Sequence, residues 1–433
     1  MKKYYLETYG CQMNFAESAA LENALKERGW QPSENPEEAH AIVLNTCSVR
    51  KSAEERVWGR LGFFKSTLRG KSVSLVLSGC LADHYGEEIR RRFPFVDCVA
   101  GNAEKSRLPE ILDQLTENRG EIDLERSSVF AFGGNHFIPG SFKAFVPIMH
   151  GCNNFCTYCI VPYVRGREIS RNPEEIINEI NELTEKGVME ITLLGQNVNS
   201  YTSNKRSFAW LLKEICSFSS VKWLRFVSSH PKDISDEIID TMAEFPQICK
   251  SLHLPVQHGA NNILSAMNRC YTKEYYLSLV SRIRRQMPEI ALSTDLLVGF
   301  PGETEADLEE TLQLIREVGF EDAFTYFFNP RTGTKAAEMK GQLSEEVKKE
   351  RLGRVIELQR EISVREKTKR LGKTVTVLAE EVSKKNGFEI LGRTEQNSMV
   401  VFPGKSGIIG SFVRVKLLSL SGTTYRGQLD DTV

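Results

Sequence analysis

The sequence predicts an α/β protein with three parts: an N-terminal parallel α/β domain, a central (βα)6 partial TIM barrel, and a small C-terminal antiparallel β-barrel. Two observations predict the first two parts. Short apolar runs alternate with helical patterns near the N-terminus, and strand and helix patterns then alternate six times. Such alternation is typical of parallel sheets covered by helices. The third observation is a set of short alternating strands after a charged helix, which favours a small barrel.

Composition sets limits on the class of protein. The chain has 433 residues, enough for about three domains, and 41% hydrophobic residues, which excludes wholesale disorder. Its 56 basic and 57 acidic residues nearly cancel, so overall positive charge does not point to nucleic-acid binding. No apolar stretch resembles a signal peptide or approaches the ~18 residues of a membrane span. We therefore expect a cytoplasmic protein with no membrane anchor, in a compartment where disulfides are rare.

The N-terminal domain is predicted over residues 1–125. Buried strands are expected at residues 4–9, 41–46 and 73–78, with helices such as 18–28 between them. This order is typical of βαβ units with a parallel sheet. Residues 126–143 contain glycines and prolines without periodicity, and they are interpreted as a linker.

The central domain is predicted over residues 144–368. Its six strands are expected to begin near residues 145, 189, 223, 251, 290 and 323. Two helix starts are well marked. Asn172 is placed to cap a helix that has Pro173 in its first turn, and Thr304 with Asp307 has the spacing of a capping box. Six parallel units suggest a barrel that is shorter and more open than the eightfold one.

The C-terminal barrel is predicted over residues 369–433, after a charged helix at about 345–370. Strands are expected at 374–378, 399–402 and 412–417. From residue 345 onward there are 17 Lys and Arg against 12 Asp and Glu. This surplus fits an ordinary solvated surface and a module that holds RNA about equally well.

A C-x3-C-x2-C cluster follows the first strand of the central domain, formed by Cys152, Cys156 and Cys159. No further Cys or His follows before Cys216. A structural zinc site needs four protein ligands, whereas three thiolates on a cubane iron–sulfur cluster leave one iron open. An open iron binds a small molecule through nitrogen and oxygen, and the spacing favours this interpretation over zinc.

Three further cysteines each come just after a predicted strand: Cys11, Cys47 and Cys80. The carboxyl ends of parallel strands meet at one sheet edge, so thiols far apart in sequence converge there. This favours a second three-thiolate cluster over three unrelated buried cysteines. Cys98, Cys216, Cys249 and Cys270 lack such an arrangement and are interpreted as structural or incidental.

The cysteine loop on the first of six βα units, with Tyr158 just before its third cysteine, resembles the radical S-adenosylmethionine (SAM) superfamily. The resemblance implies that Cys152, Cys156 and Cys159 hold a [4Fe-4S] cluster whose fourth iron binds SAM. One-electron reduction of SAM would then give a 5′-deoxyadenosyl radical, so that the cofactor carries the difficult step.

The segments 10–14, 45–48, 79–80 and 149–153 together resemble the radical SAM methylthiotransferase family over essentially the whole chain, with a C-terminal TRAM-like domain. This implies that Cys11, Cys47 and Cys80 hold an auxiliary [4Fe-4S] cluster that delivers sulfur. Residues 193–201 and 252–257 are similar to the tRNA branch. That branch converts N6-isopentenyladenosine at position 37, next to the anticodon, to its 2-methylthio derivative, with SAM as methyl donor and radical source.

Two places depart from the family pattern. His150 stands where an acid is usual, and His258 and Ala260 stand where serines are usual. They do not involve the cysteines, so they concern local contacts only.

Other polar residues are expected at the strand ends of the central domain, where ligands bind in barrels. For each of them, a contact with SAM and ordinary polar packing are both open. Residues 299–304 lack the Lys-Ser/Thr of a phosphate-binding loop, so no nucleoside triphosphate is expected there. The candidate SAM contacts are Tyr158, Gly195, Gln196, Asn197, Ser228, Gln257 and Asp295.

The expected partner is isopentenylated tRNA, bound through its anticodon loop with one base extruded, because adenine C2 is not reachable in a stacked loop. A low-potential electron donor such as flavodoxin or ferredoxin is also expected, and the protein is expected to be a monomer. The candidate phosphate contacts are Lys373, Lys384, Lys385, Arg393, Arg414, Lys416 and Arg426.

Two other functions remain open from the sequence. A sibling methylthiotransferase would have the same cysteines and act on threonylcarbamoyladenosine of tRNA or on a ribosomal protein aspartate. A zinc-stabilised, non-catalytic RNA-binding protein would use the cysteines for structure alone.

Metal analysis separates the iron and zinc interpretations. We expect anaerobically purified protein to be brown and to hold about eight irons per chain, because two cubane clusters contain four irons each. A colourless protein that contains zinc would contradict this prediction.

Overall fold

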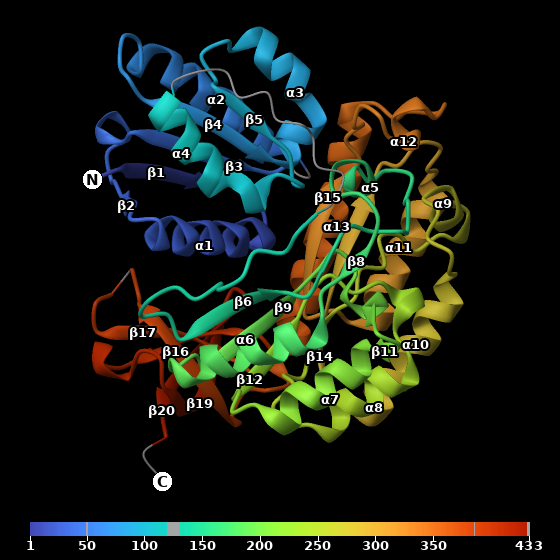
Figure 1. Ribbon diagram of the computed structural model, residues 1–433. Helices are drawn as coiled ribbons and strands as arrows, with labels where there is room; N and C mark the ends of the chain where they lie inside the picture. The colour runs from blue at the N-terminus through green and yellow to red at the C-terminus, as the bar shows by residue number, and fades with distance from the viewer. Residues whose placement is uncertain (49–50, 119–129, 385, 431–433) are drawn as a thin grey trace. The chain divides into compact units, whose positions relative to one another are not determined.

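The computed structural model describes residues 1–48, 51–118, 130–384 and 386–430. The chain forms two compact units (Figure 1). The N-terminal unit comprises residues 1–153, 159–188 and 192–196, and the C-terminal unit comprises residues 154–158, 189–191 and 197–433.

The N-terminal unit is built on a parallel five-stranded sheet with the order β2-β1-β3-β4-β5. The predicted strand at 41–46 is confirmed without change, and the other two are confirmed within one residue at each end. The sequence did not predict the short edge strands β2 and β5. The strands are β1 (Lys3–Thr8), β2 (Gln31–Pro32), β3 (Ala41–Thr46), β4 (Ser74–Gly79) and β5 (Cys98–Ala100).

Helices cover both faces of this sheet (Figure 1). On one face, apolar residues of α1 and α4 pack on Val43 and Val76, and on the other face residues of α2 and α3 pack on Leu44 and Leu77. Alternate residues of each strand thus point to opposite layers, so the strands are apolar throughout. The helices are α1 (Gln12–Glu27), α2 (Lys51–Thr67), α3 (Cys80–Arg92) and α4 (Leu108–Asn118).

The residues 130–142 form no helix or strand, and the rest of the predicted linker, 126–129, lies outside the described residues. His136 is only 4% exposed and bonds Glu179 of α6, with 2.6 Å between Nδ1 and Oε1. Asn23 of α1 donates to the carbonyl of Phe137. These contacts fix the segment although it has no regular structure. The unit also contains β6 (Lys143–Pro147), β7 (Met149–His150), β8 (Ile169–Ser170), α5 (Val161–Val164) and α6 (Pro173–Glu185).

All six strands predicted for the central domain are present. β6 is the first, and the others are β9 (Glu190–Leu194), β12 (Trp223–Phe226), β13 (Ser251–His253), β14 (Ala291–Val298) and β15 (Asp322–Phe327). In the C-terminal unit β13, β14 and β15 form one parallel sheet in that order. The helices after β9 are α7 (Phe208–Phe218), α8 (Asp236–Glu244), α9 (Asn261–Ala266), α10 (Lys273–Gln286), α11 (Glu305–Val318), α12 (Lys335–Glu338) and α13 (Glu345–Thr368).

Both predicted helix starts are confirmed. The Asn172 side chain accepts a hydrogen bond from the Glu174 amide, and Pro173 begins α6. Thr304 and Asp307 form a complete capping box at the start of α11. Two otherwise unpaired amide donors are satisfied in this way.

The C-terminal barrel is closed by five strands in the order β16-β17-β18-β20-β19. Four of its pairings are antiparallel, as expected, but β18 pairs with β20 in parallel. The sequence did not predict β17 or β20. The strands are β16 (Thr374–Val382), β17 (Glu389–Thr394), β18 (Met399–Pro403), β19 (Phe412–Ser421) and β20 (Thr424–Leu429).

Buried polar contacts hold this barrel on the central strands of the C-terminal unit. Arg225 of β12 donates to Glu190 and to the carbonyls of Thr394 and Glu395. Tyr425 of the barrel donates to the carbonyl of Lys367 at the end of α13. Because these groups are buried, losing one partner would leave another without its hydrogen bond.

No helix in the described part of the chain combines the length and apolar character that a membrane crossing requires.

Glu179 supports a testable prediction about stability. Burial opposes its ionisation, but His136 and Arg171 outweigh this and lower the pKa of Glu179 to about 2. Glu179→Gln removes the buried carboxylate of Arg171 and leaves it only the exposed Glu175, 3.5 Å from its Nε, so we expect a loss of about 3–5 kcal/mol, measured by thermal unfolding at pH 7. Since the folded-state pKa is depressed, the difference between variant and wild type should fade as pH drops from about 4.5 toward 2. Glu182→Gln, at an exposed position of the same helix, is the control, and an equal loss there would contradict the prediction.

Candidate iron–sulfur and cofactor sites

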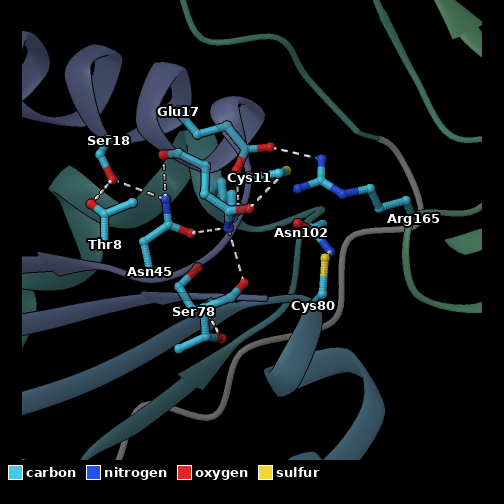
Figure 2. A network of polar contacts seen from close by, with 12 residues as sticks. Thr8, Cys11, Glu17, Ser18, Asn45, Ser78, Cys80, Asn102 and Arg165 are labelled. Atoms are coloured by element: carbon cyan, nitrogen blue, oxygen red, sulfur yellow. Dashed lines mark hydrogen bonds and ion pairs between the residues drawn. The ribbon is translucent and has the colours of Figure 1, made fainter. Parts of the chain in front are cut away.

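The three cysteines predicted to converge lie at the carboxyl ends of β1, β3 and β4, which are neighbours in the sheet. Cys11 caps α1, Cys80 begins α3, and Cys47 follows β3 directly. The Cys11 thiol is hydrogen-bonded with Cys47, and Cys11 and Cys80 both interact with the charge of Arg165. The three thiols therefore gather at one edge of the sheet, where Figure 2 shows Cys11 and Cys80.

Two glycines let the backbone carry these thiols so close together. A side chain at Gly10, whose φ is +136°, would lie 2.4 Å from Cys47 Cβ. A side chain at Gly79, whose φ is +99°, would lie 2.4 Å from the carbonyl oxygen of Thr46. Only glycine fits such positions without displacing a neighbouring strand end.

A buried amide network lies beneath the cysteines (Figure 2). Asn14 donates to Asn45 Oδ1 at 3.1 Å and to the Thr46 carbonyl at 3.0 Å, and Asn45 donates back to the Asn14 carbonyl. The Cys11 thiol lies 3.3 Å from Asn14 Oδ1. The network ties the start of α1 to the end of β3 and so fixes Cys11 relative to Cys47.

The electrostatic environment favours a thiolate at Cys11. The hydrogen bond with Cys47 outweighs burial and, with the nearby Arg165 charge, lowers the pKa of the Cys11 thiol to about 5. The amino-terminal end of a helix also stabilises negative charge. The thiolate is the form that binds metal.

Arg165 is a buried residue whose charge interacts with two of these cysteines, Cys11 and Cys80. Its Nη1 donates to Glu17 Oε1 at 2.9 Å, and its side chain is 2% exposed. Burial disfavours the charged guanidinium, but Cys80, Glu17 and Cys11 raise the pKa of Arg165 above its ordinary value. Burial also raises the pKa of Glu17, but Arg165 and Lys105 outweigh it and lower this pKa to about 2.

The segment that follows Cys159 packs against the same site within the N-terminal unit. Cys80 lies in an apolar cluster with Ile160 and Val164. Asn102 donates to the Val164 carbonyl at 2.9 Å and lies 3.6 Å from Cys80 Sγ. The chain that leaves the C-x3-C-x2-C loop is therefore in direct contact with one of the three converging cysteines.

The C-x3-C-x2-C loop connects β7 with α5. At its start, Gly151 has φ +74°, and a side chain there would meet the Arg167 carbonyl at 2.0 Å. Cys152 donates its amide to the Gly166 carbonyl. In the C-terminal unit, the Cys156 thiol lies 3.4 Å from Nη1 of Arg269, whose Nη2 donates to the Pro255 carbonyl.

Two of the candidate SAM contacts have a strained backbone. Ser228 follows β12 with φ +67°, and Gln257 follows β13 with φ +73°. Gln257 is held by backbone bonds, from its own amide to the Asp295 carbonyl and from the Leu297 amide to its carbonyl. Such conformations cluster at functional sites, and both occur where strands of the barrel end.

The other candidate SAM contacts lie near strand ends or in the core. Asn197 donates to Asp233 at 2.7 Å, while its Oδ1 is buried with no hydrogen-bond partner. Asp295 lies 3.6 Å from His253, and Tyr158 packs against an apolar cluster that includes Met267. Gly195 is buried and Gln196 half-buried, directly after β9.

The remaining cysteines differ from these. Burial raises the pKa of Cys98 to about 11 and of Cys216 to about 12, and it also raises that of Cys249. Cys270 is exposed. Their thiols are neutral or isolated, in agreement with a structural or incidental role.

The candidate phosphate contacts lie on or beside the barrel. Lys385 is outside the described residues. Lys373 pairs with Glu289, Arg393 with Glu380, and Arg426 with Glu389. Lys384, Arg414 and Lys416 are exposed and form no ion pair among the described residues. Phe388, four residues after Lys384 in the chain, is 84% exposed and was not among the residues predicted from the sequence.

The residues around Cys11, Cys47 and Cys80 suit an iron–sulfur cluster rather than a single metal ion. No three described His, Cys, Asp or Glu side chains are grouped to hold a single metal ion. A cubane does not require this, since each thiolate binds its own iron. Buried atoms without partners surround the converging cysteines: Ser78 Oγ, Asn102 Oδ1 and Arg165 Nη2. Soft thiolates with unused polar groups around them fit a bound iron–sulfur cluster.

Two of the residues that depart from the expected family pattern, His150 and His258, are buried and in contact with neighbouring side chains. His150 stacks on Phe130 at 3.6 Å between ring centroids, and burial together with Arg165 lowers its pKa to about 3. His258 is fully buried and lies 3.4 Å from Glu303, which also bonds Arg351. The structure also identifies Glu17, Arg165 and Arg269 beside the cysteines, none of which the sequence pattern singled out.

Comparison with known proteins identifies the class. Residues 146–315 match the Radical SAM superfamily, residues 3–101 match Uncharacterized protein family UPF0004, and residues 368–429 match the TRAM domain. Among solved structures, the radical SAM methyltransferase TsrM from Kitasatospora setae has a similar fold, with a TM-score of 0.59 at 16% identity over 78% of this chain and 77% of that one. The chain is thus a three-part radical SAM protein.

Curated relatives narrow the class. The tRNA-2-methylthio-N(6)-dimethylallyladenosine synthase of Treponema denticola is 45% identical over 99% of this chain and 100% of its own length. The protein with the same name from Moorella thermoacetica is 43% identical over 99% of both chains. The chain belongs to the tRNA-2-methylthio-N(6)-dimethylallyladenosine synthase family.

The depressed pKa of Cys11 predicts its reactivity in cluster-free protein. Because the pKa is about 5, Cys11 is already a thiolate at neutral pH. The rate at which iodoacetamide alkylates Cys11, followed by peptide mass spectrometry, should change little between about pH 6.5 and 8.5. The alkylation rate of an ordinary thiol of pKa ~8.5 rises roughly tenfold per pH unit below that value. Free glutathione in the same tube is the control. A rate for Cys11 that rises in parallel with glutathione would contradict the prediction.

Proposed function

We propose that this chain converts N6-dimethylallyladenosine, next to the anticodon of tRNA, to its 2-methylthio derivative. The relatives that carry this name match the chain over its whole length. One observation carries the proposal: three cysteines from three strand ends converge, and one of them packs against the segment that follows Cys159. A reaction that needs a radical source and a sulfur source requires two such sites close to one another.

Cys11, Cys47 and Cys80 hold the auxiliary [4Fe-4S] cluster in this proposal, and Cys152, Cys156 and Cys159 hold the radical SAM cluster. When bound, the two clusters and SAM supply a carbon radical and the transferred sulfur, which acid–base groups alone do not provide for an adenine C2–H bond. The low pKa of Cys11 supports ligation, since a thiolate binds iron without first losing a proton.

SAM is held at the carboxyl ends of the central strands. Ser228 and Gln257 support this placement through their strained backbone, and Asn197 through its unpartnered buried oxygen. Arg269 supports a further role that the sequence did not indicate, because it lies beside Cys156 and orders the chain around Pro255. The assigned SAM contacts are Tyr158, Gly195, Gln196, Asn197, Ser228, Gln257 and Asp295.

The barrel contacts the tRNA backbone. Arg414, Lys416 and Lys384 are the strongest candidates because no carboxylate neutralises them among the described residues. The exposed ring of Phe388, four residues after Lys384 in the chain, offers a surface on which an unpaired base stacks. Three other candidates already pair with a carboxylate and must give up that partner to bind phosphate. Each therefore contributes less to tRNA binding; they are Lys373, Arg393 and Arg426. Lys385 stays a candidate on its charge alone.

Several wider features belong to the same proposal. The protein acts as a monomer in the cytoplasm, where its ten free cysteines remain reduced. A low-potential flavodoxin or ferredoxin supplies electrons. The domains extend over residues 1–125, 144–368 and 369–433, joined by 126–143, and His136 in that joining segment anchors it on α6.

The activity assay tests the proposal directly. Anaerobically reconstituted protein, SAM, dithionite and tRNA that carries dimethylallyladenosine should give 2-methylthio nucleoside and 5′-deoxyadenosine, measured by mass spectrometry. Cys11→Ala should hold about four irons instead of about eight and still form 5′-deoxyadenosine without product. Cys98→Ala, a buried cysteine of the same sheet, is the control and should behave as wild type.

The outcome that contradicts the proposal is equally specific. Methylthiolation of tRNA that carries threonylcarbamoyladenosine, with none on dimethylallyladenosine, would assign the chain to the sibling activity. Full product formation by Cys11→Ala would remove the auxiliary site from the reaction.

A further inference from the structure

Arg165 has a hydrogen-bonding group that the protein does not use. The residue ends α5, and its side chain is 2% exposed. Nη1 donates to Glu17 and lies 3.4 Å from His150 Nδ1, whereas Nη2 is buried without any partner. Figure 2 shows the guanidinium extending toward Glu17 and Cys11, with Asn102 and Cys80 nearby. An unpaired donor on a buried cation costs free energy unless an anion occupies the space beside it.

Arg165 shares its carboxylate partner with a second buried cation. Glu17 is the carboxylate that pairs with it, and the same carboxylate also pairs with Lys105, which is itself 9% exposed. Arg165 and Lys105 therefore share the Glu17 carboxylate, and the charge of Arg165 also interacts with Cys11 and Cys80.

A second buried arginine of the same unit provides the contrast. Arg171 is 7% exposed, and its guanidinium donates to Glu179, Glu175 and the Pro147 carbonyl. None of its nitrogens is a buried atom without a partner. Arg171 is thus fully engaged, whereas Arg165 has a terminal nitrogen with no partner; Arg282, Arg351 and Arg370 each leave only Nε without a partner.

We propose that Arg165 binds and positions a small sulfur anion, a sulfide or methanethiolate, at the site formed by Cys11, Cys47 and Cys80. The inference rests on the proposed function, which requires transferable sulfur there. Arg165 supplies a charge-assisted hydrogen bond from its unused nitrogen, and Glu17 holds the guanidinium in place from the opposite side. Arg165 is a positioning residue in this role, and the cysteines remain the iron ligands.

The experiment uses the full chain with both clusters reconstituted anaerobically. Sodium methanethiolate is titrated into reduced protein, and its dissociation constant is read from the change in the electron paramagnetic resonance spectrum. Arg165→Gln should weaken binding about tenfold to a hundredfold, the value of one hydrogen bond to a charged group. Arg165→Lys should restore part of the affinity because it keeps the charge but not the planar fork. Iron content should stay at about eight per chain.

Two further variants keep the test decisive. Arg171→Lys is the matched control and should bind methanethiolate as wild type does. Glu17→Gln removes the negative charge paired with Arg165 but keeps an oxygen that accepts its hydrogen bond, so it should hold the guanidinium in place and tighten anion binding. If Arg165→Gln does not fold or retain iron, Glu17→Gln decides, and unchanged or weaker binding in that variant overturns the proposal.

The possible failures are distinguishable. Wild-type affinity in an Arg165→Gln protein that holds both clusters overturns the role of Arg165 and leaves the proposed function standing. Wild-type protein that assembles only one cluster overturns the proposed function, and the assignment of Arg165 with it.

Discussion

The edge of one parallel sheet determines the chemistry of this protein. Because β1, β3 and β4 are adjacent and parallel, the residues that follow them arrive at the same place from positions more than thirty residues apart in the chain. Helices start at that edge, and Cys11 and Cys80 stand at the first positions of two of them, so both thiols lie at amino-terminal helix ends, which favour negative charge. Gly10 and Gly79 permit the close approach of the backbone. A site of this kind needs no dedicated metal-binding loop, because the topology assembles it.

The second cysteine set obeys a different constraint. Its three members lie within eight residues of one loop, so local chain geometry rather than sheet topology brings them together. The tight contact of Gly151 with the Arg167 carbonyl fixes the start of the loop, and Arg269 stands beside its central cysteine. The segment that leaves this loop joins the N-terminal unit, where Val164 and Arg165 contact the groups around Cys80 and Cys11. Six residues thus separate the last loop cysteine from the arginine at the other site.

Much of this arrangement was predictable from sequence, and the reasons for the exceptions are physical. The strand ends at Cys11, Cys47 and Cys80 were evident because buried parallel strands are continuous apolar runs. The ion pair of Glu17 with Arg165 was not predictable from the sequence, because its members are 148 positions apart and single charges carry no periodic signal. β17 and β20 were missed because each contains a glycine, Gly392 and Gly427, where a side chain would collide with Val377 or Val415. Close packing in a small closed barrel requires glycine at the positions where a strand pattern needs an apolar residue.

The hydrogen bonds that attach the barrel determine its orientation within the C-terminal unit. Arg225 of β12 is hydrogen-bonded to Thr394 and Glu395 at the end of β17, and Tyr425 is bonded to the end of α13, so two separate points join the barrel to the rest of the C-terminal unit. Two attachments suppress the swivelling that a single flexible tether would allow. Within the C-terminal unit, the barrel therefore keeps a fixed orientation on β12 and α13, and any ligand bound on the barrel would share that orientation.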